Sequence, residues 1–211
     1  MNAPDSGDGG LSVHRSEALS DGIYAVAMTL LVIELKLPEQ AVSGPEFNAA
    51  LVHLLPKIAA WTISFFVLAM FWYGHHRAFA HVRRADGKLI TLNLLQLAFV
   101  SLLPFSCALT GEHGRHWPSQ VIYSANMALL SLVALLTARY IHHHPDPARM
   151  TMPAAVYRGV RVRVVGLIVI SVAAVAIAMV APGAGNIAFV LMWLIMPFSR
   201  RAERVAPAPQ S

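Results

Sequence analysis

The sequence predicts an all-α membrane protein with six transmembrane helices in each subunit. Of the 211 residues, 56% are hydrophobic and only 13% are charged, and the mean hydropathy is +0.57. A soluble domain of this length usually carries about 25% charged residues. Long apolar stretches alternate with short links that hold the basic residues, which is the pattern of membrane topology. The pI near 9.8 therefore reflects these links, and no nucleic-acid partner is expected.

We expect one membrane domain, residues 12–200, between two disordered tails, residues 1–11 and 201–211. The first tail is rich in Gly, Asp and Pro, a composition typical of disorder. It has neither the basic stretch nor the apolar stretch of a signal peptide, so no cleavable signal is predicted. The single cysteine, Cys107, excludes an intrachain disulfide.

The first span covers about residues 17–36, and Pro38 ends it. Its centre, from Gly22 to Ile33, has no charge and, with the flanking leucines, is about long enough to cross a bilayer. A short apolar piece follows at residues 47–55. It is too short to cross, and we expect it to be a separate surface helix lying in the membrane interface.

Five further spans complete the predicted bundle. They cover about residues 56–77, 89–109, 119–140, 162–181 and 186–199. Pro56 opens the second span, and Trp72 near its other end suits the aromatic belt at a membrane surface. Asn93 and Gln96 in the third span can bond to neighbouring helices. A polar link, residues 141–160, separates the fourth span from the fifth.

Six spans place both termini on one side of the membrane, and the basic residues identify that side. Thirteen of the 16 Lys and Arg residues fall on the side of the termini. The other three are Lys36, Lys57 and Arg115. Because cytoplasmic loops carry the excess of Lys and Arg, both termini are expected to be cytoplasmic.

The sequence offers little for catalysis or metal binding. The consecutive histidines His142 to His144 have no cysteine or acidic cluster beside them and fit a solvated loop better than a metal site. Phosphate-binding loops, zinc-protease motifs and nucleophile elbows are missing from the sequence. Asp21 and Glu34 only bracket the first span, whereas a proton-coupled transporter normally carries ionisable groups deeper in the membrane. We therefore expect no enzyme, no cofactor and no metal.

The first span has one continuous aliphatic face. At 100° per residue, Leu30 and Ile33 fall within about 40° of Val26, and Thr29 lies about 60° to one side. Asp21 lies about 140° away and faces elsewhere. By spacing alone, ordinary helix packing or lipid contact is the simpler explanation of this face.

The start of the first span carries a recognisable motif. Arg15 followed by Leu19, Ser20 and Asp21 resembles the Arg-x-x-x-Phe-Ser-Asp signature of the transmembrane protein 175 family, the endolysosomal potassium channel and its bacterial relatives. Leu19 stands where the family usually has phenylalanine. Further stretches that look like the bacterial members are Phe71-Trp72-Tyr73-Gly74-His75-His76-Arg77, Arg83-Arg84-Ala85-Asp86, Leu92-Asn93-Leu94-Leu95 and Leu103-Pro104-Phe105.

The resemblance implies a pore lined by the first helix, with four subunits around it. It places the narrowest ring at Val26 and the next rings at Leu30 and Ile33, with Thr29 close by. It also implies a structural role for the motif of Arg15, Leu19, Ser20 and Asp21, which would hold the first helix against the second and third. The partners that it suggests for this motif are Trp72, His76 and Asn93.

We therefore predict a homotetrameric, potassium-permeable cation channel with an aliphatic constriction and modest potassium-over-sodium selectivity. The resemblance places it in the inner membrane of a bacterium, where the lipid bilayer and potassium ions are its expected partners. Two alternatives are a secondary transporter of a small solute and a non-conducting membrane scaffold subunit. A narrow apolar ring can gate by dewetting, and the sequence has no carbonyl filter of the Thr-Val-Gly-Tyr-Gly type.

Overall fold

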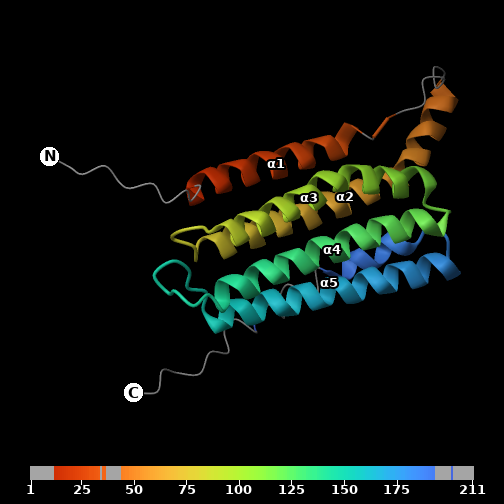
Figure 1. Ribbon diagram of the computed structural model, residues 1–211. Helices are drawn as coiled ribbons and strands as arrows, with labels where there is room; N and C mark the ends of the chain where they lie inside the picture. The colour runs from red at the N-terminus through yellow and green to blue at the C-terminus, as the bar shows by residue number, and fades with distance from the viewer. Residues whose placement is uncertain (1–11, 34, 37–43, 193–200, 202–211) are drawn as a thin grey trace.

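The computed structural model describes residues 12–33, 35–36, 44–192 and 201, and within these ranges it is all-α (Figure 1). The elements are α1 (Val13–Ile33), α2 (Gly44–Phe79), α3 (Gly87–His113), α4 (Trp117–His142), α5 (Ala154–Val180) and the 3-10 helix η1 (Gly185–Leu191). Five of these helices, α1 to α5, are long and apolar enough to cross a membrane. The predicted all-α membrane fold is thus confirmed.

The helices form a layered bundle with α1 at one edge. Figure 1 shows α1 lying along α3 and α2, with α4 and α5 on the far side of that pair. The chain then returns through η1, which packs mainly on α5. Within the described part of the chain, most of α1 therefore has neighbours on one side only.

The sixth predicted span, residues 186–199, is described only at its start. Its first residues lie in η1, and residues 193–200 fall outside the described part of the chain. The same holds for the predicted tails, except for Arg201. Gly185 fixes the close approach of this segment to the bundle, because a Cβ there would lie 2.6 Å from Gln120 Oε1 and 2.8 Å from the Ala174 carbonyl oxygen.

The expected division of residues 47–77 into a surface helix and a separate span is wrong. The structure has one helix of 36 residues, α2, with Pro56 inside it. Proline removes a helical hydrogen bond but can be accommodated with a kink. In Figure 1 the first part of α2 leans away from the rest of the helix.

The polar link expected at residues 141–160 is also too long. Helix α5 begins at Ala154, so Arg158 lies within its first turns, followed by Arg161 and Arg163. Arginine is a good helix former, and its long side chain can carry the charge toward the membrane surface. The basic residues therefore indicate where the chain enters the membrane, whereas the helix itself begins several residues earlier.

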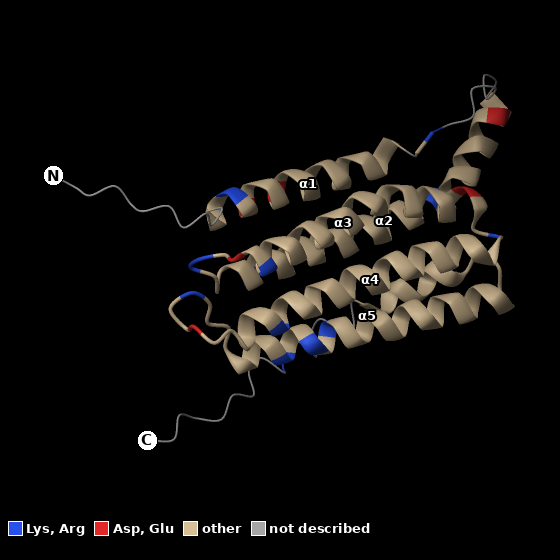
Figure 2. Ribbon diagram, viewed as in Figure 1, with Lys and Arg blue, Asp and Glu red and all other residues tan. Residues whose placement is uncertain are grey.

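The charged residues are divided between the two ends of the bundle. Figure 2 shows Lys and Arg concentrated where α1 and α5 begin and in the loops that join α2 to α3 and α4 to α5. The described basic residues near the opposite end are Lys36, Lys57 and Arg115. The helices between these ends are almost free of charge.

Candidate functional site

The two sides of α1 differ in exposure. Val26, Leu30 and Ile33 are 56%, 41% and 53% exposed, and Thr29 is exposed beside them. The buried residues of the opposite side are Ser16, Ser20, Tyr24, Ala27 and Leu31. The predicted constriction residues therefore share the face of α1 that the described part of the subunit leaves open.

The buried side of α1 is fixed to α3 by the amide of Asn93, which is 1% exposed. Its Nδ2 donates to Ser16 Oγ at 3.0 Å and to Ser20 Oγ at 3.1 Å. Its Oδ1 lies 2.8 Å from Nε2 of His75, and an amide oxygen only accepts, so His75 donates this bond. Helices α1, α2 and α3 thus meet at one satisfied amide.

A second buried bond lies one helical turn further along α3. Gln96 Nε2 donates to the Tyr24 hydroxyl at 2.8 Å, and both side chains are buried. The Tyr24 ring also lies 5.9 Å from the ring of His75. In a membrane, polar side chains on packed helices bond to one another because no water is there to satisfy them. The two bonds fix both the rotation and the height of α1 on α3.

Asp21 contacts α2 at the border of the exposed face. Trp72 Nε1 donates to Asp21 Oδ1 at 2.8 Å, and the ring of His76 stacks on Trp72 with 6.1 Å between centroids. Arg15 and Leu19 are exposed, and no described side-chain contact joins either of them to the other motif residues. Of the predicted pairs, the structure thus brings Asp21 to Trp72 and Ser20 to Asn93. His76 contacts Trp72 and reaches Asp21 only by way of that ring.

Ser16, Tyr24 and His75 also belong to this support, although they were not among the residues predicted from the sequence. A signal was available, because Ser16, Ser20 and Tyr24 recur every four residues and so share one helix face. His75 gave no such signal. Its neighbour His76 has the same chemistry, and only the fold shows which of the two points inward.

These features define a class: a multi-pass α-helical membrane protein whose first helix rests on a buried polar network and leaves an aliphatic face open. The chain belongs to the TMEM175 family. The profile of this family, described as "Endosomal/lysosomal potassium channel TMEM175", matches residues 15–104. These residues include nearly all of α1, all of α2 and most of α3, the helices that build the site. The family is one of ion channels and not of enzymes.

Relatives of known identity support the assignment. A potassium channel of Streptomyces collinus is 34% identical over 156 residues, covering 71% of this chain and 74% of the relative. A potassium channel of Chamaesiphon minutus is 33% identical over 151 residues, covering 71% and 72%. The crystal structure of a lysosomal potassium-selective channel TMEM175 homolog from Chamaesiphon minutus superimposes with a TM-score of 0.72 at 26% identity, covering 89% of this chain and 97% of that one.

The substitution Asn93→Ala tests the buried network. It removes the partner of Ser16 Oγ and of His75 Nε2, whereas Ser20 still donates to the Ser16 carbonyl at 2.8 Å. Each buried group left unsatisfied costs about 1–3 kcal/mol. We expect the melting temperature of the detergent-purified protein to fall by several degrees. Leu94→Ala is the matched control, because Leu94 is exposed on the same helix. Equal melting of the two variants would show that the network does not hold α1.

Proposed function

We propose that this protein is a potassium-permeable channel in which the open face of α1 lines the pore of a homotetramer. The observation that carries the proposal is the exposure of Val26, Leu30 and Ile33 on a helix whose other face is fixed by buried polar bonds. A pore helix needs both properties. Its lining must face away from its own subunit, and its position must be held by contacts behind it.

Oligomerisation follows from this arrangement. The open face lies at the edge of one subunit, so it can enclose a pathway only if copies of α1 meet around an axis. Closed cyclic symmetry is the usual result of such repeated contacts. The number four comes from the family resemblance, and the relatives named as potassium channels support potassium as the permeant ion.

The proposed constriction combines aliphatic rings with a hydroxyl. A ring of Val26 side chains passes ions only when it is wet, so it can act as a gate by dewetting. Thr29 donates its hydroxyl hydrogen to the Val26 carbonyl at 2.8 Å. The lone pairs of the Thr29 oxygen then remain available to a cation or to its hydration water. Potassium, with its weaker hydration, would pass such a neck more easily than sodium.

The proposed orientation has both termini in the cytoplasm of a bacterium. The described Lys and Arg residues concentrate at the end of the bundle where α1 begins (Figure 2). Cytoplasmic ends of membrane proteins carry this excess of positive charge. The motif of Arg15, Leu19, Ser20 and Asp21 then lies near the inner surface, and its Ser20 and Asp21 support α1 without contacting the ions.

Potassium flux tests the function directly. We expect liposomes that contain the purified protein to pass potassium down its gradient without saturation and without a coupled solute. Saturable flux that requires a second solute would identify a secondary transporter. Sealed liposomes with no flux and a detergent-purified particle of single-subunit mass would favour a scaffold subunit.

Cross-linking tests the oligomer. A cysteine at Leu30, in a Cys107→Ser background, should form disulfide-linked subunits in membranes because copies of the open face meet at the axis. Val169→Cys is the control, because Val169 is at least as exposed as Leu30 but lies on α5, away from α1. Cross-linking at Val169 but not at Leu30 would mean that the α1 face contacts lipid.

The selectivity of the channel tests the constriction. Valine is one methylene smaller than isoleucine and nearly fixed in its rotamer, so Val26→Ile narrows the ring and should reduce sodium passage more than potassium passage. Val26→Asn makes the ring polar and should raise total flux severalfold. Reversal potentials under potassium and sodium measure both effects. Val32→Ile, on α1 but outside the aliphatic face, should change neither, and unchanged selectivity in the Val26 variants would move the constriction to Leu30.

A further inference from the structure

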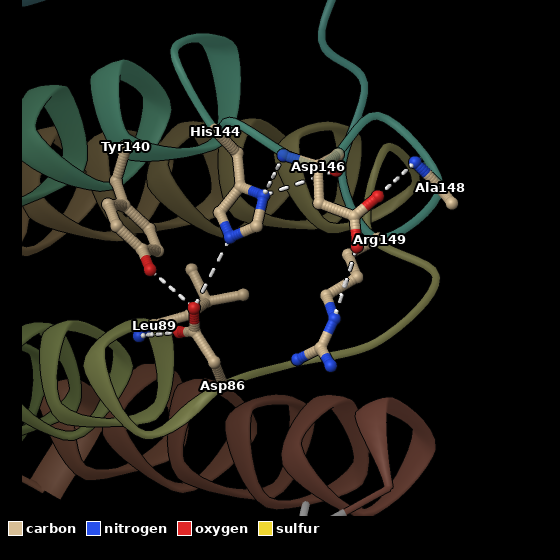
Figure 3. Close-up of polar contacts among 7 residues, drawn as sticks. All are labelled: Asp86, Leu89, Tyr140, His144, Asp146, Ala148 and Arg149. Atoms are coloured by element: carbon tan, nitrogen blue, oxygen red, sulfur yellow. Dashed lines mark hydrogen bonds and ion pairs between the residues drawn. The ribbon is translucent and has the colours of Figure 1, made fainter.

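A polar cluster joins two loops at the end of the bundle where α1 begins (Figure 3). The loops are residues 80–86, between α2 and α3, and residues 143–153, between α4 and α5. Asp86 lies at the centre of this cluster. It caps α3 by accepting from the backbone N–H of Leu89 at 2.9 Å, and it accepts a second hydrogen bond from the hydroxyl of Tyr140. The Nε2 atom of His144 lies 3.4 Å from the Oδ2 atom of Asp86.

Backbone bonds hold the same two loops together. Val82 and Met150 form an isolated antiparallel bridge, the Arg83 N–H donates to the Arg149 carbonyl at 2.7 Å, and the Thr151 N–H donates to the His81 carbonyl at 3.0 Å. Val82 and Met150 are buried in an apolar cluster with residues of α3, α4 and α5. The loops therefore form one connected surface on which the polar cluster is fixed.

His144 is placed so that either protonation state finds partners. Its side chain is only 8% exposed. Its Nδ1 lies 3.1 Å from the backbone N–H of Asp146 and 3.2 Å from the Asp146 carbonyl oxygen. The neutral ring can accept from that N–H while Nε2–H points at Asp86. The protonated ring can instead donate from Nδ1 to the carbonyl and from Nε2 to Asp86.

Asp86 is the carboxylate that is available to His144, because the other carboxylate nearby, Asp146, has partners of its own. Asp146 is engaged by Arg149, with Nε and Oδ2 3.4 Å apart, and by the Ala148 N–H at 2.9 Å. The ammonium of Lys88 lies over the Tyr140 ring, 4.9 Å from its centroid. On the facing loop, the other charged or titratable side chains are His81, Arg83 and Arg84, of which the two arginines are exposed.

Asp86 stays ionised over the range in which histidine titrates. Burial acts to raise the pKa of its carboxyl group, but the hydrogen bonds from Tyr140, from the Leu89 N–H and from His144 outweigh this, and the pKa lies below its usual value. Histidine is the side chain that ordinarily changes charge between pH 5 and 8.

We propose that His144 is a proton-responsive positioning residue, whose protonation strengthens the link from the α4–α5 loop to the cap of α3. Helix α3 transmits the effect. Asn93 lies seven residues after Asp86, about two turns along the same helix, and bonds to Ser16 and Ser20 of α1. The consequence for conduction rests on the proposed function; the link between the loops does not.

Thermal stability between pH 8 and pH 5.5 tests the link without reference to flux. His144→Gln keeps a neutral donor but cannot gain a proton. A charged imidazole bonds to a carboxylate more strongly than a neutral one, so the stabilisation is present at low pH and is lost as the pH rises. The melting temperature of the wild-type protein should exceed that of His144→Gln by a margin that grows as the pH falls. His143→Gln, which changes an exposed neighbour, should keep the wild-type response.

Asp86→Asn identifies the partner, because asparagine is also a good N-cap but carries no charge. It should remove the same pH-dependent margin, and the double variant should lose nothing further. If His144→Gln and the wild-type protein respond to pH in parallel, the proposal is wrong. The same conclusion follows if His144→Gln still changes the response of the melting temperature to pH when Asp86 has been replaced by Asn.

Flux in liposomes at symmetric pH separates this proposal from the proposed function. The ratio of flux at pH 5.5 to flux at pH 8 should differ severalfold from one in the wild-type protein and in His143→Gln, and move toward one in His144→Gln. No flux in any variant, together with the expected stability margins, would reject the channel and leave the link. Flux with the same pH ratio in wild type and His144→Gln would reject the positioning role.

Discussion

The buried amide of Asn93 is the interaction on which the placement of α1 depends. It satisfies two serines of α1 and the imidazole of His75 at once, in a region where an unpaired polar group is expensive. Because these bonds have defined directions, they fix the rotation of α1 in a way that apolar contacts alone could not. The orientation of the aliphatic face follows from the bonds on the opposite side of the helix.

Helix α3 is therefore the central support of the subunit. Its N-cap residue, Asp86, contacts Tyr140 of α4 and His144 of the α4–α5 loop. Further along the helix, Asn93 and Gln96 hydrogen-bond to α1. The polar contacts in the membrane-spanning part of this support are mostly between neutral groups, which cost less to bury than charges. The charged contacts are at the ends, where water can reach them. Movement of α3 would be transmitted to α1 through these bonds and through the apolar packing between the two helices.

Much of this architecture could be predicted from the sequence, because hydropathy and the distribution of Arg residues depend directly on the bilayer. The apolar stretches located the spans, and the Arg15 to Asp21 motif identified the family. The errors arose where one residue type has two uses. Pro56 was interpreted as the start of a span but lies inside α2, and Arg158 was interpreted as part of the polar link but lies in α5. The roles of His75 and His144 depend on contacts between distant segments, so no local pattern could indicate them.

The kink in α2 has a consequence for the way the protein fits its bilayer. The part after Pro56 is roughly 35 Å long, close to the thickness of a hydrocarbon core of about 30 Å. The part before it carries exposed apolar side chains, among them Phe47, Leu51 and Val52. This first part can lie against the lipid surface at an angle set by the bend at Pro56. The bend at Pro56 would thus let this first part follow the membrane surface while the rest of α2 keeps its own tilt across the bilayer.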